Sequence, residues 1–473
     1  MKQTRIVLGI AALVAAVMLP WPALGQDVGQ QTVPGKEPPA EKESEKPADK
    51  PADKAAEHQA SNKKTDGDWG FRWDGRPSLH LGEGTRVDFR VRLQNEIWHS
   101  DATLALDDDS DGDNDLNADV ARRRIGIEGE ILNIFDYQVE RELTANRDPW
   151  RDVYLNYKQY GFAEVMAGKF KVPFSLDENT SSTNLDFVNR SRIATLLAPG
   201  RDVGVMVHGR FLPRGILRYE LGLFNEDGSN AERNDTDYVH GDRTVAGRLL
   251  AQPFRSTKSV AEDLAVGVSF TTSELPEGLS GLRGRTELDE WFYRPEVLVN
   301  GRRQRIGVEA RWRPGPFSVK SEFIRLTDER LGESIEGTDL SPFFSQGWYV
   351  SGTWAVTGEK KAEGFDSPLR PLFRGPFFKG WIGAVELAAR AERIRFGSVD
   401  TDISDVLPST APRAEIVLGN TDLAYTFGVN WYANRWIKVQ LNLVRNTIGF
   451  PDQGPNPEQS SFWSRIVRFQ FSM

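Results

Sequence analysis

Apolar and polar residues alternate along most of the chain after residue 85. In residues 86–94, valine, phenylalanine and leucine occupy the odd positions, while arginine, aspartate and glutamine occupy the even ones. Residues 122–131 repeat the pattern, with isoleucine on three of the five odd positions and mainly charged residues on even ones. Because successive side chains of a β-strand point to opposite faces, this pattern predicts strands with one apolar and one polar face.

The alternation predicts about sixteen strands, an even number, as a single-chain bacterial barrel requires. They lie near residues 86–94, 122–131, 135–143, 150–159, 162–168, 202–211, 215–225, 243–252, 263–272, 302–312, 316–327, 346–357, 381–396, 419–432, 435–447 and 461–472. A soluble sheet also alternates, but the repetition and the longer polar loops on alternate connections favour a barrel. We therefore predict an all-β protein, a transmembrane antiparallel β-barrel with its polar face toward the lumen.

Aromatic residues recur near the ends of the predicted strands, where a membrane barrel needs amphipathic rings at the lipid–water boundary. They are Trp98, Trp150, Trp348, Tyr349, Trp381, Trp431, Tyr432, Trp436 and Trp463. This placement predicts two aromatic girdles around the barrel.

One connection, between the predicted strands that end near 168 and begin near 202, breaks the pattern. At roughly thirty residues it is too long for an ordinary connector. It is polar, but it also carries apolar side chains that could pack against another part of the protein. These are Phe170, Phe174, Leu176, Leu185, Phe187 and Val188. We predict that it folds into the barrel and constricts the pore.

The same connection carries recognisable motifs. They are Gly168-Lys-Phe-Lys-Val-Pro-Phe-Ser-Leu176, Thr180-Ser-Ser182, Phe187-Val-Asn-Arg-Ser191 and Ala198-Pro-Gly-Arg-Asp-Val-Gly-Val205. With Gly383-Ala-Val-Glu-Leu-Ala-Ala-Arg390 and Phe427-Gly-Val-Asn-Trp-Tyr432, they resemble the phosphate-selective porin O and P family over about residues 80–473. The resemblance implies a homotrimeric outer-membrane porin for passive diffusion of small anions, such as phosphate or polyphosphate.

Several arginines occupy positions that are predicted to face the barrel interior. Arg86, Arg90, Arg92, Arg122 and Arg124 share the polar face of two neighbouring predicted strands, and Arg303, Arg305 and Arg311 lie on a later one. A guanidinium offers a fork of donors that fits phosphate oxygens, and it keeps its charge. A ladder of such groups could pass an anion onward without one deep binding well. The resemblance implies ladder roles for Arg122 and Arg124, and constriction roles for Lys171 and Ser181.

Carboxylates share the inward parity, among them Glu128, Glu140, Glu220, Glu309 and Glu322. Because porin lumens carry both signs of charge, a general diffusion porin with weak ion preference is the first alternative. Asp177 and Asp186 lie in the constriction loop itself, whereas Lys361 is predicted to lie in a loop outside the permeation path.

The chain before the barrel divides into two predicted segments. Residues 1–25 combine a positive start, an apolar run and small residues near Gly25, which predicts a secretory signal peptide. Residues 26–67 are rich in Pro, Lys, Glu and Ala, which predicts a disordered periplasmic spacer. We predict that residues 68–473 form the barrel, which lies in the outer membrane of a Gram-negative-type bacterium and contacts lipid and lipopolysaccharide. The second alternative is a structural barrel that anchors the envelope through the spacer.

Other chemistry receives little support. Asp107, Asp109 and Asp111 fit the first positions of a calcium loop, but Ala118 stands where a bidentate glutamate belongs, so a solvated loop is favoured over a metal site. The sequence carries no common nucleophile-elbow, zinc-protease or phosphate-loop motif, and we predict neither an enzyme nor a cofactor. The net charge of −9 argues against nucleic acid as a partner.

Overall fold

The computed structural model describes residues 69–473, apart from 74, 83, 103–115, 145–147, 233–238, 365–367, 376–379, 399–408 and 451–459. The predicted signal peptide and spacer lie outside the described residues. The candidate metal ligands Asp107, Asp109 and Asp111 also lie outside them.

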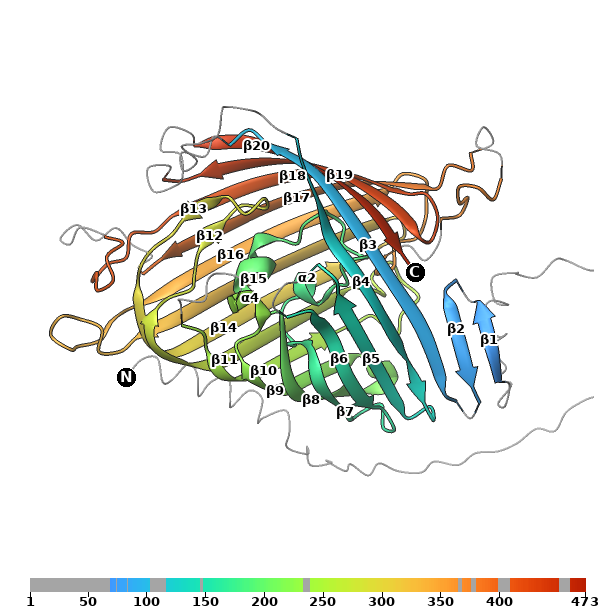
Figure 1. Cartoon of the computed structure of the whole chain (residues 1–473), viewed down its shortest axis with the longest axis horizontal. Helices are drawn as coiled ribbons and strands as arrows, with labels where there is room; N and C mark the ends of the chain where they lie inside the picture. The colour runs from blue at the N-terminus through green and yellow to red at the C-terminus, as the bar shows by residue number, and fades with distance from the viewer. Residues whose placement is uncertain are drawn as a thin grey trace, which may run out of the picture. The chain divides into compact units, whose positions relative to one another are not determined.

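One antiparallel sheet of eighteen strands dominates the described chain, and sixteen of these strands close into a barrel (Figure 1). The last strand closes the barrel on the first, with Phe471 opposite Leu93. The barrel strands are β3 (Arg86–Ser100), β4 (Asn117–Ile131), β5 (Phe135–Glu142), β6 (Trp150–Tyr157), β7 (Glu164–Lys171), β8 (Arg201–Phe211), β9 (Leu217–Glu226), β10 (Asp242–Ala251), β11 (Ala265–Leu279), β14 (Leu298–Trp312), β15 (Phe317–Arg330), β16 (Leu340–Ala355), β17 (Ala384–Gly397), β18 (Thr421–Tyr432), β19 (Ile437–Ile448) and β20 (Ser461–Ser472). The predicted barrel is confirmed, and each predicted strand overlaps one of these.

Alternation along each strand sorts the side chains between the two barrel faces. On β14, Ile306 and Val308 are about half exposed on the outside, whereas Arg305 and Glu309 are buried on the inside. The outer face is therefore apolar and suited to lipid, and the inner face is polar.

Two residues of the predicted aromatic girdle face inward instead. Tyr349 is buried and donates to the Glu322 carboxylate at 2.9 Å, while its neighbour Trp348 is exposed. Tyr432 is likewise buried beside Trp431. Adjacent residues on a strand point to opposite faces, so only one member of each pair can reach lipid.

Short elements outside the barrel wall escaped sequence prediction. The hairpin of β1 (Trp69–Trp73) and β2 (Pro77–Leu81) precedes β3 and extends its sheet. Strands β12 (Gly284–Arg285) and β13 (Trp291–Tyr293) pair in the connection between β11 and β14. The helices are α2 (Leu176–Asn179), α3 (Arg192–Leu197), α4 (Ser229–Glu232) and the 3₁₀ turn η1 (Pro213–Gly215). Within the described ranges, no helix is long and apolar enough to cross a membrane.

Residues 172–200, called the constriction segment below, join β7 to β8 and fold into the barrel (Figure 1). Phe174, Leu185, Val188 and Ile193 of this segment are almost fully buried. The segment therefore has its own apolar contacts inside a polar lumen, and the prediction of an inward-folded loop is confirmed.

Candidate pore constriction

Backbone groups of the constriction segment bind side chains on the barrel wall formed by β14–β19. The Glu322 carboxylate on β15 accepts the amides of Leu176 at 2.6 Å and Asp177 at 2.9 Å. On β19, the Asn442 side-chain oxygen accepts the Val188 amide at 2.7 Å. A loop would otherwise leave these buried amides without partners, which costs about 1–3 kcal/mol for each group. The wall thus fixes the segment by satisfying its backbone.

A buried ion-pair cluster adds a second anchor. Asp186 of the constriction segment lies 2.7 Å from the amines of both Lys320 on β15 and Lys361, and Lys361 also pairs with Glu386 on β17. Lys361 belongs to the connection between β16 and β17. Burial lowers the pKa of Lys361, but the charges of Asp186 and Glu386 outweigh it and raise that pKa above its usual value.

This cluster corrects the prediction for Lys361. The residue does lie in a connection, but its side chain is only 1% exposed and is bound to the constriction segment. It is therefore part of the constriction's support. The neighbouring Lys360 is exposed and carries the same charge.

The two aspartates of the constriction segment are both engaged within the protein. Asp177 accepts the Ser191 amide at 2.7 Å, next to the start of α3, and Asp186 binds the two lysines. Neither carboxylate lines the main cavity of the barrel. Their negative charges therefore do not face a solute in that cavity.

A cavity of about 910 Å³ lies between the constriction segment and the wall of β3–β9. Its cationic lining is Arg90, Arg92, Arg122, Arg124, Arg151, Lys171, Arg190, Arg192, Arg201, Arg218 and Arg468. Its anionic lining is Glu96, Asp119, Glu128, Glu142, Asp152, Glu178, Glu220, Glu287 and Asp289. Smaller cavities of about 560 and 250 Å³ share lining residues with it, Arg90 with the former and Arg218 with the latter. The three cavities therefore adjoin along one side of the lumen and are together called the passage below.

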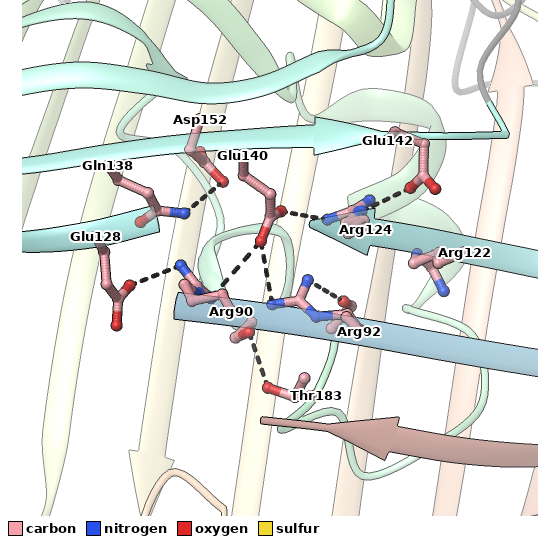
Figure 2. A network of polar contacts seen from close by, with 12 residues as sticks. Arg90, Arg92, Arg122, Arg124, Glu128, Gln138, Glu140, Glu142, Asp152 and Thr183 are labelled. Atoms are coloured by element: carbon pink, nitrogen blue, oxygen red, sulfur yellow. Dashed lines mark hydrogen bonds and ion pairs between the residues drawn. The ribbon is translucent and has the colours of Figure 1, made fainter. Parts of the chain in front are cut away.

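Arginines and glutamates interleave on the wall of β3–β5 (Figure 2). Arg90 pairs with Glu128 at 2.7 Å, while Arg124 pairs with Glu142 at 2.6 Å and with Glu140 at 3.1 Å. These carboxylates hold the guanidinium groups in place and offset much of their charge. The arginines of the predicted ladder lie on one wall of the cavity, and Arg90 and Arg124 are paired with glutamates there.

Two cations of the cavity have no carboxylate partner among the described residues. Arg122 donates to the neutral Gln94 side chain at 2.8 Å. Lys171 donates to backbone carbonyls of the constriction segment, those of Glu178 and of Thr180, the latter at 3.0 Å. Carbonyl and amide oxygens hold the side chains but carry no full negative charge. Arg122 and Lys171 are therefore held by neutral groups, unlike the paired arginines of the same cavity.

The predicted hydroxyl ligand also lies at this cavity. Ser181 lines it and exchanges a hydrogen bond of 3.0 Å with the Thr183 hydroxyl. The adjacent Ser182 accepts a hydrogen bond of 2.9 Å from Arg92, which lies 3.7 Å from Glu140. The constriction segment therefore brings hydroxyl groups to the arginine row.

Two of the three arginines predicted on β14 lie elsewhere. Arg303 pairs with Asp227 and Asp328 at 2.7 Å each, and all three are buried. Arg305 binds Asp227 at 2.8 Å and donates to the Leu197 carbonyl at 2.6 Å. Neither arginine lines any of the three cavities. Parity was correct, but both guanidinium groups are occupied in holding loops to the wall.

The remaining two predicted arginines lie at the margins. Arg86 is half-buried and lies 3.2 Å from Asp88 and 3.4 Å from Glu130. Arg311 lines only the smallest cavity and lies 3.8 Å from Glu363.

Sequence reasoning overlooked other cavity cations. Arg468 has the inward parity of its predicted strand and could have been found by counting. Arg190 lies inside the Phe187–Ser191 motif that the resemblance rests on, and it donates to the Thr180 carbonyl at 2.6 Å. Arg201 begins β8 and pairs with Asp152 at 3.0 Å.

A closed sixteen-stranded barrel with an inward constriction segment and a charged passage defines an outer-membrane porin. The model of the family phosphate-selective porin O and P matches residues 91–449, and the chain belongs to this family.

The chain is also similar to individual proteins. Porin O of Pseudomonas aeruginosa is 30% identical over 148 residues, which is 29% of this chain and only 28% of that protein. The structure of an anion-selective porin from Comamonas acidovorans matches with a TM-score of 0.50 and 11% identity, covering 82% of this chain and all of the other. The channel DcaP of Acinetobacter baumannii matches with a TM-score of 0.49 and 10% identity, covering 82% and 98%. At 11% identity the Comamonas acidovorans structure shows likeness of fold alone.

Proposed function

We propose that this porin admits small anions by passive diffusion through the passage beside the constriction segment, and that inorganic phosphate or polyphosphate is its natural solute. The observation that carries the proposal is that Arg122 and Lys171, two cations of this cavity, are held by neutral oxygen atoms and form no ion pair with a carboxylate. A low-dielectric wall focuses such charge on the passage and raises the local concentration of anions.

The paired arginines suit transport better than tight binding. Arg90 and Arg124 are already paired with glutamates. An arriving phosphate must therefore compete with these carboxylates for the guanidinium donors, and it is held weakly at each step. Conduction requires sites that are favourable enough to enter but weak enough to leave. Phosphate as the solute rests on the family's description and on the guanidinium and hydroxyl donors around Ser181, which fit its oxygens.

Ion selectivity in planar bilayers tests the proposal. In a salt gradient, we expect the wild-type reversal potential to indicate anion preference, and Lys171→Glu and Arg122→Glu each to shift it toward cations. Lys360→Glu makes the same charge change at an exposed position away from the cavities and should leave the potential unchanged. Added phosphate should reduce chloride current in the wild type, and less so in Lys171→Glu.

A cation-selective wild type would contradict the anion proposal. A Lys171→Glu variant with the same reversal potential as Lys360→Glu would also contradict it. The general diffusion porin would then be the better description, because the acidic residues of the cavity would dominate. The envelope-anchoring alternative predicts instead that residues 26–67 retain cell-wall material in a pull-down.

The predicted assembly and surroundings remain proposals. We propose a homotrimer, as the family resemblance implies, embedded in outer-membrane lipid and lipopolysaccharide. Chemical cross-linking in outer-membrane fragments should give a three-chain product, and a product limited to two chains would contradict it.

A further inference from the structure

The β1–β2 hairpin carries a row of exposed aromatic side chains. Trp69, Phe71 and Trp73 on β1 are 74%, 64% and 59% exposed. Contiguous exposed apolar surface of this kind marks a place where a protein meets another apolar phase or partner. The pore and the constriction do not use these residues.

Pairing fixes the position of the hairpin on the barrel. Strand β20 ends with Ser472 opposite Arg92 of β3, and β2 takes over further along the same edge, with Leu79 opposite Val87. The hairpin therefore replaces β20 where β3 extends beyond it. The Trp436 indole, in the turn between β18 and β19, donates to the Gly75 carbonyl at 2.7 Å and holds the hairpin turn to the barrel.

The register decides which way the aromatic row faces. Leu79 lies opposite Phe71 on one side and opposite Val87 on the other, so these three side chains share one face of the sheet. Val87 has the parity of Phe89 and Leu93, which are exposed on the lipid-facing surface of β3. Trp69 and Trp73 differ from Phe71 by two residues and therefore face the same way.

The opposite face of the hairpin belongs to the polar interior. Ser78 of β2 donates to the Asp88 carboxylate of β3 at 2.5 Å, and both side chains are buried. The aromatic row thus continues the lipid-facing surface, while the polar row continues the lumen surface.

The hairpin lies at the end of the barrel where most connections are short, such as residues 132–134 between β4 and β5; the longer connections at this end are residues 252–264 and 356–383. In outer-membrane barrels the short turns are periplasmic. Figure 1 shows β1 and β2 at the same end as the C-terminus. The row therefore stands at the periplasmic edge of the lipid-facing belt.

We propose that Trp69, Phe71 and Trp73 insert into the periplasmic leaflet at the level of the phospholipid headgroups and anchor the hairpin to the membrane. Continuity with the lipid-facing belt supports lipid as the occupant. Tryptophan also suits this depth, because its ring prefers the apolar side and its N–H can bind headgroups or water. The inference is independent of ion selectivity.

Spin labelling tests this directly, because the chain contains no cysteine. Phe71→Cys carries a nitroxide label, and the protein is reconstituted in vesicles of phosphatidylethanolamine and phosphatidylglycerol. Collision rates are measured with oxygen, which concentrates in lipid, and with a water-soluble nickel chelate. Labels at Phe427, half exposed on the outside of β18, and at Ile335, 91% exposed in the connection between β15 and β16, set the lipid and water limits.

We expect the oxygen-to-nickel ratio at position 71 to exceed that at position 335 several-fold and to lie below that at position 427. A ratio equal to that at position 335 would place the row in water and overturn the proposal. A label shielded from both reagents would also overturn it, because another part of the chain or a second copy would then cover the row. Heat-modifiable migration in gels verifies that each labelled barrel is folded.

Discussion

Replacing Lys361 by methionine tests whether a buried ion pair holds the constriction segment in place. The lysine amine lies 2.7 Å from the Asp186 carboxylate and also pairs with Glu386, and all three side chains are nearly inaccessible. Methionine fills a similar volume without the charge. The substitution therefore leaves the two carboxylates buried with one cation fewer between them.

The expected loss of stabilising free energy depends on the partners that Asp186 and Glu386 keep in the variant. Removing one partner of a buried ion pair costs about 3–5 kcal/mol, because a charge is left uncompensated. Asp186 keeps Lys320 at 2.7 Å, and Glu386 keeps hydrogen bonds from Asn430 at 2.9 Å and Tyr432 at 3.0 Å. We therefore expect the low end, about 3 kcal/mol. The loss weakens attachment of the constriction segment, because Lys361 takes no part in the strand pairing of the barrel.

Single-channel recording in planar bilayers measures the consequence. We expect Lys361→Met to show a higher mean conductance and more open-channel noise than the wild type, with unchanged heat-modifiable migration of the barrel. Lys360→Met is the matched control at the exposed neighbouring residue. Asp186→Asn should lower the stability less when it is added to Lys361→Met than when it is made in the wild type, because the two residues act as a pair. Identical conductance and noise in the two lysine variants would refute the anchoring role.

Three further outcomes are expected. Burial raises the pKa of Glu290, between β12 and β13, to about 7, so packing of this connection is strongest below about pH 4.5 and weakens by up to about 3 kcal/mol as the pH rises toward 7. Hydrogen exchange corrected for its intrinsic pH dependence should show this loosening over residues 284–293, and Glu290→Gln should remove it; a pH-independent wild type would contradict it. Ile125→Asp, exposed to lipid, should impair insertion into vesicles, whereas Arg122→Asp on the lumen side of the same strand should fold; equal yields would contradict the assignment of faces. Deleting residues 27–66 should leave folding and conductance unchanged, and loss of the heat-modifiable barrel would argue against a spacer.

The strands could be predicted because the environment of a membrane barrel imposes a local rule. Lipid on one side and water on the other require alternation within each strand, and residues 86–94 and 122–131 satisfy it without reference to distant residues. The β1–β2 hairpin follows the same rule, since Trp69, Phe71 and Trp73 alternate with Gly70 and Arg72. It was overlooked because five residues are too few to separate a strand from chance.

The site was less predictable, because parity gives the direction of a side chain but not what it meets. Arg122 and Arg305 both point inward, yet one faces a cavity beside a neutral glutamine and the other is bound to Asp227. Asp227 lies far away in sequence, directly after β9. Only the tertiary fold, in which β9, β10, β11 and β14 pair in succession, brings these partners together, so no local pattern distinguishes the two arginines.

The distribution of anchors explains why the passage lies along one side of the lumen. Most bonds from the wall to the constriction segment come from β14–β19, including Glu322, Lys320 and Asn442. The segment therefore occupies that side and leaves space beside β3–β9, where Arg122 faces the cavity. Lys320 and Lys361 on the occupied side bind the segment, whereas Arg122 on the open side lines the cavity beside a neutral glutamine. Changes on β14–β19 should then act through the width of the passage, and changes on β3 and β4 through its charge.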